Sequence, residues 1–340
     1  MKLKELAERL GLSQTTVSRA LNGYPEVNEE TRTRVAEAAR ALGYRANASA
    51  RRLATGRANA IGLVLPDEGS NLFGPHTSEY LAGVAGRLAQ DEIDILITPL
   101  EHGDEMLAYR RLISSHRVDA VIVGSPTPHD ARVSALCDLG FPFVLHGRTE
   151  VGKPHAWLDI DNRGGFYSAT THLIDLGHRR IAMIDGPKGH TFSAHREQGF
   201  REALLARGIT PDPRLIALDR FADETGFRHA QSFFALDEPP TAIVAGSMMT
   251  ALGVFRAIRS ADLTLGKDVS MIAHDDVFPY LNADNMVPSM STTRSSIRAA
   301  GNRIAELVLQ VLAGKPVEQI HELWPVELVL RASTGPAPQK

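Results

Sequence analysis

The chain has 340 residues, of which 43% are hydrophobic, and its formal net charge is −3. This length suits about two to three compact units rather than one core, and no apolar run approaches the roughly 20 residues of a membrane-spanning helix. Residues 1–5 lack the apolar stretch of a secretory signal, and the single cysteine, Cys137, excludes an intrachain disulfide and fits a reducing cytoplasm.

Charge is distributed unevenly along the chain. Residues 1–57 hold 11 Lys and Arg against 6 Asp and Glu, whereas residues 58–340 hold 26 against 34. A small basic unit on an acidic body favours nucleic-acid binding at one end of the chain. The alternative is a basic surface that is merely solvated.

Two short helices are predicted at the N-terminus, over Leu3–Leu10 and within Leu12–Asn22, with a tight turn between them. Ser13 can cap the second helix, because its hydroxyl can accept from a backbone N–H that has no helical partner. Val17 and Leu21 are four residues apart and can pack on the same inner face. Two helices in this arrangement, the second with a polar outer face, form a helix-turn-helix.

The outer face of the second helix carries the side chains that we expect to meet DNA. Gln14 and Arg19, with Thr15 beside them, are predicted to read bases, because Gln and Arg pair bidentately with adenine and guanine edges. Thr16 and Ser18 are predicted to bond mainly phosphate. The full set of predicted DNA contacts is Ser13, Gln14, Thr15, Thr16, Ser18, Arg19, Asn22, Asn47, Ala50 and Leu53.

Further helical stretches follow before the body of the chain. A third helix is predicted to begin after Asn28, which can cap it, and to end at Gly43. The stretch Asn47–Ala54 also begins with a capping residue, but eight residues are too few for a stable isolated helix.

From residue 58 onward, short apolar runs alternate with helical stretches, which predicts parallel sheets covered by helices on both faces. Two such series, with a break near Asp159–Gly164, predict two lobes. The predicted strands are Ala60–Leu65, Ile93–Leu96, Ala120–Gly124, Pro142–Leu145, Arg180–Asp185, Leu215–Leu218, Ala242–Ala245 and Val269–Ala273. The predicted helices are Ser78–Ala89, Glu105–Ser115, Glu197–Arg207, Asp223–Phe234 and Thr250–Ser260.

The chain resembles the LacI/GalR family of transcription regulators along essentially its whole length. The resemblance is specific, because several separate motifs occur in the family's order. They are Thr16-Val17-Ser18-Arg19, Leu21-Asn22, Glu30-Thr31-Arg32, Leu42-Gly43-Tyr44, Asn47, Ala50-Arg51-Arg52-Leu53, Ile61-Gly62-Leu63-Val64-Leu65-Pro66, Asp161-Asn162, Gly177-His178-Arg179-Arg180-Ile181 and Asp275-Asp276.

The resemblance implies an architecture. The family's core has the fold of periplasmic sugar-binding proteins, so we expect two doubly wound α/β lobes with a ligand in the cleft. Three crossings between the lobes are expected, near Asp159–Gly164, Ser289–Arg294 and His321–Pro325. The expected parts are a helix-turn-helix head over 1–46, a hinge helix and linker over 47–57, and an effector-binding and dimerisation core over 58–340.

The stretch Asn47–Ala54 is expected to fold into a helix only on DNA. Leu53 is then predicted to wedge into the minor groove at the operator centre and to bend the duplex. Two such helices, one per subunit, are expected to pack together there, so that a change of lobe angle could separate them. The alternative is a flexible tether with Leu53 in core contact.

Ligands of open α/β sheets bind beyond the carboxyl ends of the strands. Arg196 matches the family's Arg-x-x-Gly segment, whose arginine holds sugar hydroxyls or a purine; the alternative is a surface salt bridge. Asp275 matches the family aspartate that accepts from ligand hydroxyls, whereas Asp276 is expected to cap the next segment. Phe221 is expected against the ligand face, with core packing as the alternative.

Departures from the family pattern leave the effector's identity open. Ser247-Met248 stands where the family usually has Asn-Asp, and only Ser247 can still bond a ligand well. His274 stands where many relatives have Phe or Tyr. The lining residues expected from the other lobe are Asn71, Phe73, His76 and His146, with an ordinary polar contact as the alternative for the two histidines.

No HExxH, CxxC, Gly-x-Ser-x-Gly or Walker signature occurs, so we expect no catalytic residue, metal or cofactor. A periplasmic binding protein is the rival for the body alone, but the helix-turn-helix and the missing signal count against it. The resemblance implies a cytoplasmic homodimeric repressor that binds a near-palindromic DNA operator and responds to a sugar, with an α-glucoside as one choice. The alternative is a corepressor-dependent or activating regulator with a purine or other nucleotide-like ligand.

Overall fold

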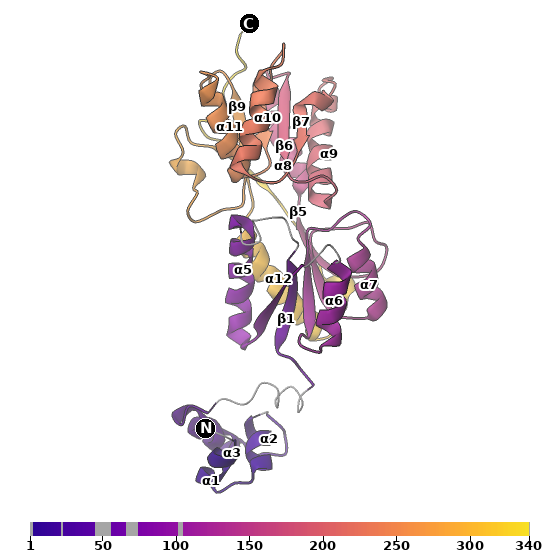
Figure 1. Cartoon of the computed structure of the whole chain (residues 1–340), viewed down its shortest axis with the longest axis vertical. Coiled ribbons are helices and arrows are strands. Elements are labelled where there is room, and N and C mark those ends of the chain that lie inside the picture. The colour runs from indigo at the N-terminus through magenta and orange to yellow at the C-terminus, as the bar shows by residue number, and fades with distance from the viewer. Residues whose placement is uncertain (1–2, 22, 45–55, 66–73, 101–104, 340) are drawn as a thin grey trace.

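The computed structural model describes residues 3–21, 23–44, 56–65, 74–100 and 105–339 of the chain (Figure 1). Within these ranges a small all-α unit precedes two α/β lobes, which confirms the predicted fold class. Six residues with predicted roles lie outside the described residues, namely Asn22, Asn47, Ala50, Leu53, Asn71 and Phe73. In the part of the chain that is described, no helix is long and apolar enough to cross a membrane.

The all-α unit packs three helices around a small apolar core. They are α1 (Leu3–Leu10), α2 (Gln14–Leu21) and α3 (Glu29–Ala41). Leu6, Val17 and Val35, one from each helix, are fully buried against one another. Because burial of each such side chain contributes about 1.5–3 kcal/mol, this contact fixes which face of α2 turns outward.

The N-terminal lobe contains a six-stranded parallel sheet in the order β11-β5-β4-β3-β1-β2. Its strands are β1 (Ala60–Leu65), β2 (Asp94–Pro99), β3 (Ala120–Gly124), β4 (Phe143–His146), β5 (Ala156–Ile160) and β11 (His321–Trp324). Its helices are α5 (Pro75–Leu88) and α12 (Ile297–Leu312) on one face, and α6 (Glu105–Ser114) and α7 (Ala131–Leu139) on the other (Figure 1). Cys137 of α7 is partly buried and packs against the apolar cluster on the face of the sheet that α6 and α7 cover.

The C-terminal lobe repeats this plan with the order β12-β10-β9-β8-β6-β7, in which only the β10–β12 pair is antiparallel. Its strands are β6 (Ile181–Asp185), β7 (Ile216–Leu218), β8 (Ala242–Ala245), β9 (Ser270–Asp275), β10 (Ser291–Arg294) and β12 (Glu327–Val329). Its helices are α8 (Asn162–Asp175) and α9 (Thr191–Ala206) on one core, and α10 (Asp223–Phe234) and α11 (Met248–Ser260) on the other.

Four short 3₁₀ turns complete the described elements, η2 (Ala89–Asp91), η3 (Pro213–Leu215), η4 (Ala283–Asn285) and η5 (Val317–Gln319). The chain passes between the lobes after β5, between β10 and α12, and between β11 and β12. These passages lie at or next to the three predicted places. The lobes are therefore discontinuous in sequence, and a ligand between them touches segments that are far apart along the chain.

The helices α8 and α12 have no counterpart among the predicted ones, and α5 and α9 begin earlier than predicted. α9 begins at Thr191, six residues before the predicted start at Glu197. The N-cap residue, His190, makes no side-chain cap bond, so no capping signal marks that start. α12 was not expected, although Ser296 caps it through a bond from the Ala299 amide.

Candidate functional site

The second helix of the head is capped as predicted. The Ser13 hydroxyl accepts from the Thr16 amide at 3.0 Å, and the two hydroxyls lie 2.8 Å apart. Val17 and Ala20 are buried, while Gln14, Thr15 and Arg19 are exposed. The cap and the buried face together turn a row of hydrogen-bonding side chains outward.

One basic residue of the head, Arg32, binds backbone carbonyls within the head. Arg32 of α3 donates through Nη2 to the carbonyls of Tyr24 and Val27, at 3.2 and 3.1 Å, and so holds the turn that follows α2. Asn28 caps α3 as predicted, accepting from the Thr31 amide at 2.8 Å. Arg32 therefore stabilises the turn between α2 and α3.

Arg196 lies in the second turn of α9 and is almost fully buried, with 5% exposure. Its Nε donates to Asn162 Oδ1 at 2.7 Å, and its Nη1 donates to Asp185 Oδ1 at 3.0 Å and to the Gly246 carbonyl at 2.9 Å. These partners come from α8, the end of β6 and the residue after β8. The guanidinium thus ties together three segments at the carboxyl ends of the C-terminal strands, where a ligand site was expected.

Three aromatic rings surround this guanidinium. Its Cζ lies 5.0 Å from the ring centre of Phe166, 5.3 Å from that of Phe192 and 6.0 Å from that of Phe221. Gly186 allows this packing, because a Cβ there would lie 2.7 Å from atoms of both Phe192 and Phe221. Phe221, predicted to face the ligand, and Phe192, which was not predicted, are both only partly buried. Arginine over aromatic faces is favourable in such a dry setting.

Asp185 is the acidic partner beneath Arg196 and has 1% exposure. Burial raises the pKa of Asp185, whereas Arg196 and the Gly186 amide act in the opposite direction. With a guanidinium at 3.0 Å that stays charged at any ordinary pH, we take this carboxylate as ionised. Its second oxygen, Oδ2, is buried without a hydrogen-bond partner among the described residues.

Asp275 is the last residue of β9, and Asp276 follows it. Asp275 Oδ1 accepts from the Val277 amide at 2.8 Å and so stabilises the turn, which had been expected of Asp276. Burial raises the pKa of Asp275. The Asp276 carboxylate instead lies 3.5 Å from His274 Nε2 and 3.6 Å from His76 Nε2. Burial alone would raise the pKa of Asp276, but the nearby His76 and His274 bring it to about 2.

The N-terminal lobe contributes two histidines to the same region. His76, near the start of α5, reaches Asp276 across the cleft. His146, at the end of β4, stacks on Tyr80 with 4.9 Å between ring centres. Burial lowers the pKa of His146 to about 4, with His76 acting in the same direction, so it is neutral at pH 7. Both histidines remain predicted lining residues.

Ser247 is engaged within its own helix. Its hydroxyl accepts from the Thr250 amide at 3.1 Å and donates to the Thr250 hydroxyl at 3.0 Å, so it caps α11. A ligand contact by Ser247 would have to compete with this cap. Met248 is fully buried in the core of the lobe.

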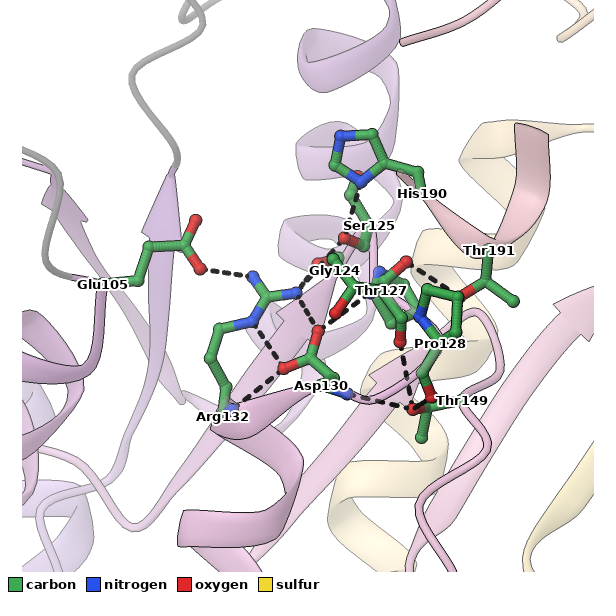
Figure 2. Close-up of polar contacts among 11 residues, drawn as sticks. Glu105, Gly124, Ser125, Thr127, Pro128, Asp130, Arg132, Thr149, His190 and Thr191 are labelled. Atoms are coloured by element: carbon green, nitrogen blue, oxygen red, sulfur yellow. Dashed lines mark hydrogen bonds and ion pairs between the residues drawn. The ribbon is translucent and has the colours of Figure 1, made fainter. Parts of the chain in front are cut away.

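A loop of the N-terminal lobe contacts the start of α9 directly (Figure 2). Pro126 offers its carbonyl to both the amide and the hydroxyl of Thr191, at 2.8 and 2.9 Å. Ser125 offers its carbonyl to His190 Nδ1 at 3.0 Å, and its own φ of 47° lies in the left-handed region. Such a backbone is costly for a residue other than glycine, so neighbouring contacts must hold it.

Arg132 supplies those contacts. Figure 2 shows its guanidinium between Glu105 and Asp130, at 2.8 Å from the former and 2.7 Å from the latter. Its Nη2 also donates to the Gly124 and Ser125 carbonyls, at 3.1 and 3.2 Å. Burial alone would raise the pKa of Asp130, but the bonds from Arg132 and from two backbone amides lower it overall. The loop is therefore held in a shape that presents carbonyls to α9.

Several of these residues were not predicted from the sequence. They are Phe166, Asp185, Thr191 and Phe192, whereas Asn162 and Asp276 were named only as motif residues, with a capping role expected of Asp276. Asp185 carried a usable signal, because it is the last residue of a buried strand, where ligand groups gather. Among the described residues, no group of three or more His, Cys, Asp or Glu side chains is placed to hold a metal ion.

Comparison with known proteins gives matches over both parts of the chain. Residues 2–47 match the family "Bacterial regulatory proteins, lacI family", and residues 170–334 match "Periplasmic binding protein-like domain". The chain is 47% identical over 342 residues to the HTH-type transcriptional regulator AglR of Rhizobium meliloti (strain 1021), covering 100% of this chain and 96% of that protein.

Two solved structures extend the comparison. The complex of the transcriptional regulator CelR with cellobiose is similar, with a TM-score of 0.72, 28% identity, and coverage of 98% of this chain and 99% of that one. The lac repressor dimer bound to operator and the anti-inducer ONPF shares the fold, with a TM-score of 0.83, 23% identity and the same coverage.

Proposed function

The chain belongs to the lacI family of bacterial regulatory proteins and is a helix-turn-helix transcriptional regulator, and on that basis we propose that it represses a carbohydrate-utilisation operon. It binds a near-palindromic operator as a homodimer, and a sugar held between the lobes alters that binding. Its place of action is the cytoplasm, where operator DNA lies. Regulation, without catalysis, is its whole activity.

The observation that carries this proposal is the outer face of α2. A capped eight-residue helix with Val17 and Ala20 turned inward presents Gln14, Thr15 and Arg19 together. A helix of this size fits the major groove, where these side-chain types distinguish base pairs. The excess of basic residues in the first 57 positions supports it through attraction to phosphates.

The dimer follows from the reach of one head. A single recognition helix reads a few base pairs, so two copies related by a two-fold axis are needed for a specific site, and their operator is then near-palindromic. The predicted hinge helix Asn47–Ala54 joins each head to its core. Its two copies, with Leu53 in the minor groove, would transmit a change of lobe angle to the DNA.

The sugar effector is supported by the donors and acceptors around the cleft. Arg196, Asp275 and the rings of Phe192 and Phe221 offer hydrogen bonds and flat apolar faces, which together suit a sugar ring. The similar regulator CelR has been solved with cellobiose. An α-glucoside remains one choice among the sugars for this chain.

A purine or other nucleotide-like corepressor is the second candidate. The rings of Phe192 and Phe221, with centres 5.9 Å apart and planes tilted by 34°, could also hold a planar base beside Arg196. Both candidates use the same cleft, and they predict opposite effects of the ligand on operator affinity if the nucleotide acts as a corepressor.

The experiment is a melting-temperature screen of the full chain against neutral sugars, sugar phosphates and purines, followed by operator gel shifts with each stabilising ligand. A specific ligand raises the melting temperature by mass action. A sugar that stabilises the chain and releases the operator supports repression with induction. A purine that stabilises it and tightens the operator complex would establish the second candidate instead.

A further inference from the structure

The wall of the cleft contributed by the C-terminal lobe holds three aspartates near Arg196, with Arg294 beside Asp275 at the end of β10. Asp185, Asp275 and Asp276 are each at most 7% exposed and lie at the ends of β6 and β9. Arg196 lies among them and interacts electrostatically with both Asp185 and Asp276. His274 adds no positive charge at neutral pH, because burial and the nearby Arg196 lower its pKa.

The charge of Arg196 is already balanced within the protein. Asp185 Oδ1 lies 3.0 Å from its Nη1, and the pair is buried on both sides, with 6% and 0% side-chain exposure. In such a dry setting opposite charges interact far more strongly than in water, so the pair presents little net positive charge to a ligand. An incoming anion would meet the guanidinium and its carboxylate together.

Three basic side chains that the structure describes on the facing side of the cleft add little positive charge either. Arg148, after β4, donates to Asp159 Oδ2 at 2.8 Å and is neutralised there. His146 is neutral at pH 7, because burial lowers its pKa to about 4. His76 lies 3.6 Å from Asp276, and the Asp276 carboxylate would balance a positive charge on the His76 ring.

The same wall has spare hydrogen-bond acceptors. Asp185 Oδ2 is buried without a partner among the described residues, and the Ser193 hydroxyl, two residues after Thr191 on α9, is in the same condition. A buried acceptor without a donor costs about 1–3 kcal/mol. A ligand hydroxyl that donates its hydrogen would relieve this cost, whereas an ionised phosphate or carboxylate oxygen, which only accepts, would not.

We propose that Asp185 is a specificity-determining residue of the effector site. Asp185 forms a neutral pair with Arg196, and the cleft therefore selects an uncharged, hydroxyl-rich effector and rejects a phosphorylated or carboxylated one. This selectivity rests on the proposed function, because it concerns the ligand of the same cleft. It narrows that ligand by excluding sugar phosphates and nucleotides. Specificity here comes from rejection as well as from attraction.

The test compares the full chain with Asp185→Asn, which keeps the size of the side chain and removes its charge. The control is Asp212→Asn, which removes a carboxylate of the same lobe that pairs with Arg214 and Arg180 at the opposite end of β6. The probe is inorganic phosphate at about 10 mM, compared with sodium chloride of equal ionic strength, and the readout is the melting temperature.

We expect phosphate to leave the melting temperature of the unsubstituted chain and of Asp212→Asn unchanged. In Asp185→Asn the uncompensated guanidinium should bind phosphate and raise the melting temperature by about 2 °C or more. Equal stabilisation of all three proteins, or none in Asp185→Asn, would overturn the proposal.

A second measurement keeps the proposal testable if Asp185→Asn does not fold. The unsubstituted chain is titrated with glucose and glucose 6-phosphate, and with maltose and maltose 6-phosphate. Tighter binding of either phosphorylated sugar than of its parent overturns the charge selection, and preference for the parent by about tenfold, or 1.4 kcal/mol, supports it. Failure of the proposed function would show differently, as loss of operator binding by the unsubstituted chain.

Discussion

The amide and the hydroxyl of Thr191 both donate to the carbonyl oxygen of Pro126, so the first turn of the helix that carries Arg196 is bonded to the opposite lobe. Pro126 belongs to a loop whose carbonyls are aligned by Arg132 (Figure 2). A ligand that changed the angle between the lobes would therefore act on these two bonds.

Arg132→Ala should destabilise the core strongly. The substitution leaves Asp130, which has 1% exposure, without its counter-ion, and breaking a buried pair costs about 3–5 kcal/mol. The melting temperature should fall by about 6 °C or more. Arg214→Ala, which removes an exposed partner from Asp212, should change it little.

The contribution of Arg132 should also depend on pH. The folded-state pKa of Asp130 is below its ordinary value, so this stabilisation is present above the unfolded pKa of about 3.8 and is lost as the pH falls through the folded pKa. The difference in melting temperature between the unsubstituted chain and Arg132→Ala should be constant from pH 8 to 5 and shrink below pH 3.8. A difference that grows on acidification would contradict this account.

His146 should make the core less stable in mild acid. Its folded-state pKa is about 4 against an ordinary value of 6.5, so between these values the unfolded chain binds a proton that the folded one does not. Stability is therefore lost as the pH falls from 6.5 to 4, by about 2 kcal/mol once residual exposure is allowed for.

His146→Phe is the variant that tests this, because it can keep the stacking on Tyr80 and does not titrate. Denaturant unfolding at pH 7 and at pH 5 should show a smaller loss in the variant than in the unsubstituted chain. Equal losses would mean that a group other than His146 carries the effect.

Arg196→Ala should abolish the response to the effector while leaving operator affinity intact. Since it also strands the Asp185 carboxylate, it should lower core stability by about 3–5 kcal/mol. The double variant Arg196→Ala with Asp185→Ala should recover part of that loss, and a double-mutant cycle measures the coupling. A variant that still releases the operator at ordinary effector concentrations would show that Arg196 is not in the effector site.

Arg19→Ala should weaken operator binding by about 1–3 kcal/mol and relax specificity at one base pair. Affinities for operators substituted at each position provide the measurement. A uniform loss over all sequences, together with a shallower salt dependence, would make Arg19 a phosphate contact. Arg32→Ala, in contrast, should lower the stability of the head, because it frees the carbonyls of Tyr24 and Val27.

Leu53→Ala should reduce specific binding strongly and diminish the bend of the operator, while nonspecific binding stays nearly unchanged. The reason is that the wedge acts by unstacking one base step. Gel mobility of a set of DNA fragments with the operator at different positions measures the bend. Unaltered bend and affinity would favour the tether interpretation of residues 47–54.

The head could be predicted almost completely from the sequence, because its signals are local. Ser13 and Asn28 each cap a helix through an amide three residues away, and Val17 packs where its spacing places it. Strands such as β1, β3 and β8 were predicted with their observed bounds for a similar reason, since each is a continuous apolar run.

Sequence pointed to the candidate site through Arg196, whose ligand role stays a prediction. Its observed partners Asn162, Asp185 and Gly246 lie 34, 11 and 50 positions away, and such distances leave no local pattern. The turn bond expected of Asp276 is made by Asp275, and two adjacent carboxylates are equivalent in sequence. Only the turn at Val277 decides which of them faces the backbone.

Gly246 limits how this cleft could be redesigned. A Cβ at that position would lie 1.9 Å from Asp185 Oδ1, and also 2.9 Å from the Asp185 Cα. Shortening the side chain at 185 removes the first clash but not the second, because the second is with the main chain of a paired strand. A new ligand preference is therefore reachable by single steps at position 185, whereas position 246 is closed to any side chain until β6 and β8 move apart. Selection experiments for a new ligand should therefore yield substitutions at position 185 and hardly any at position 246.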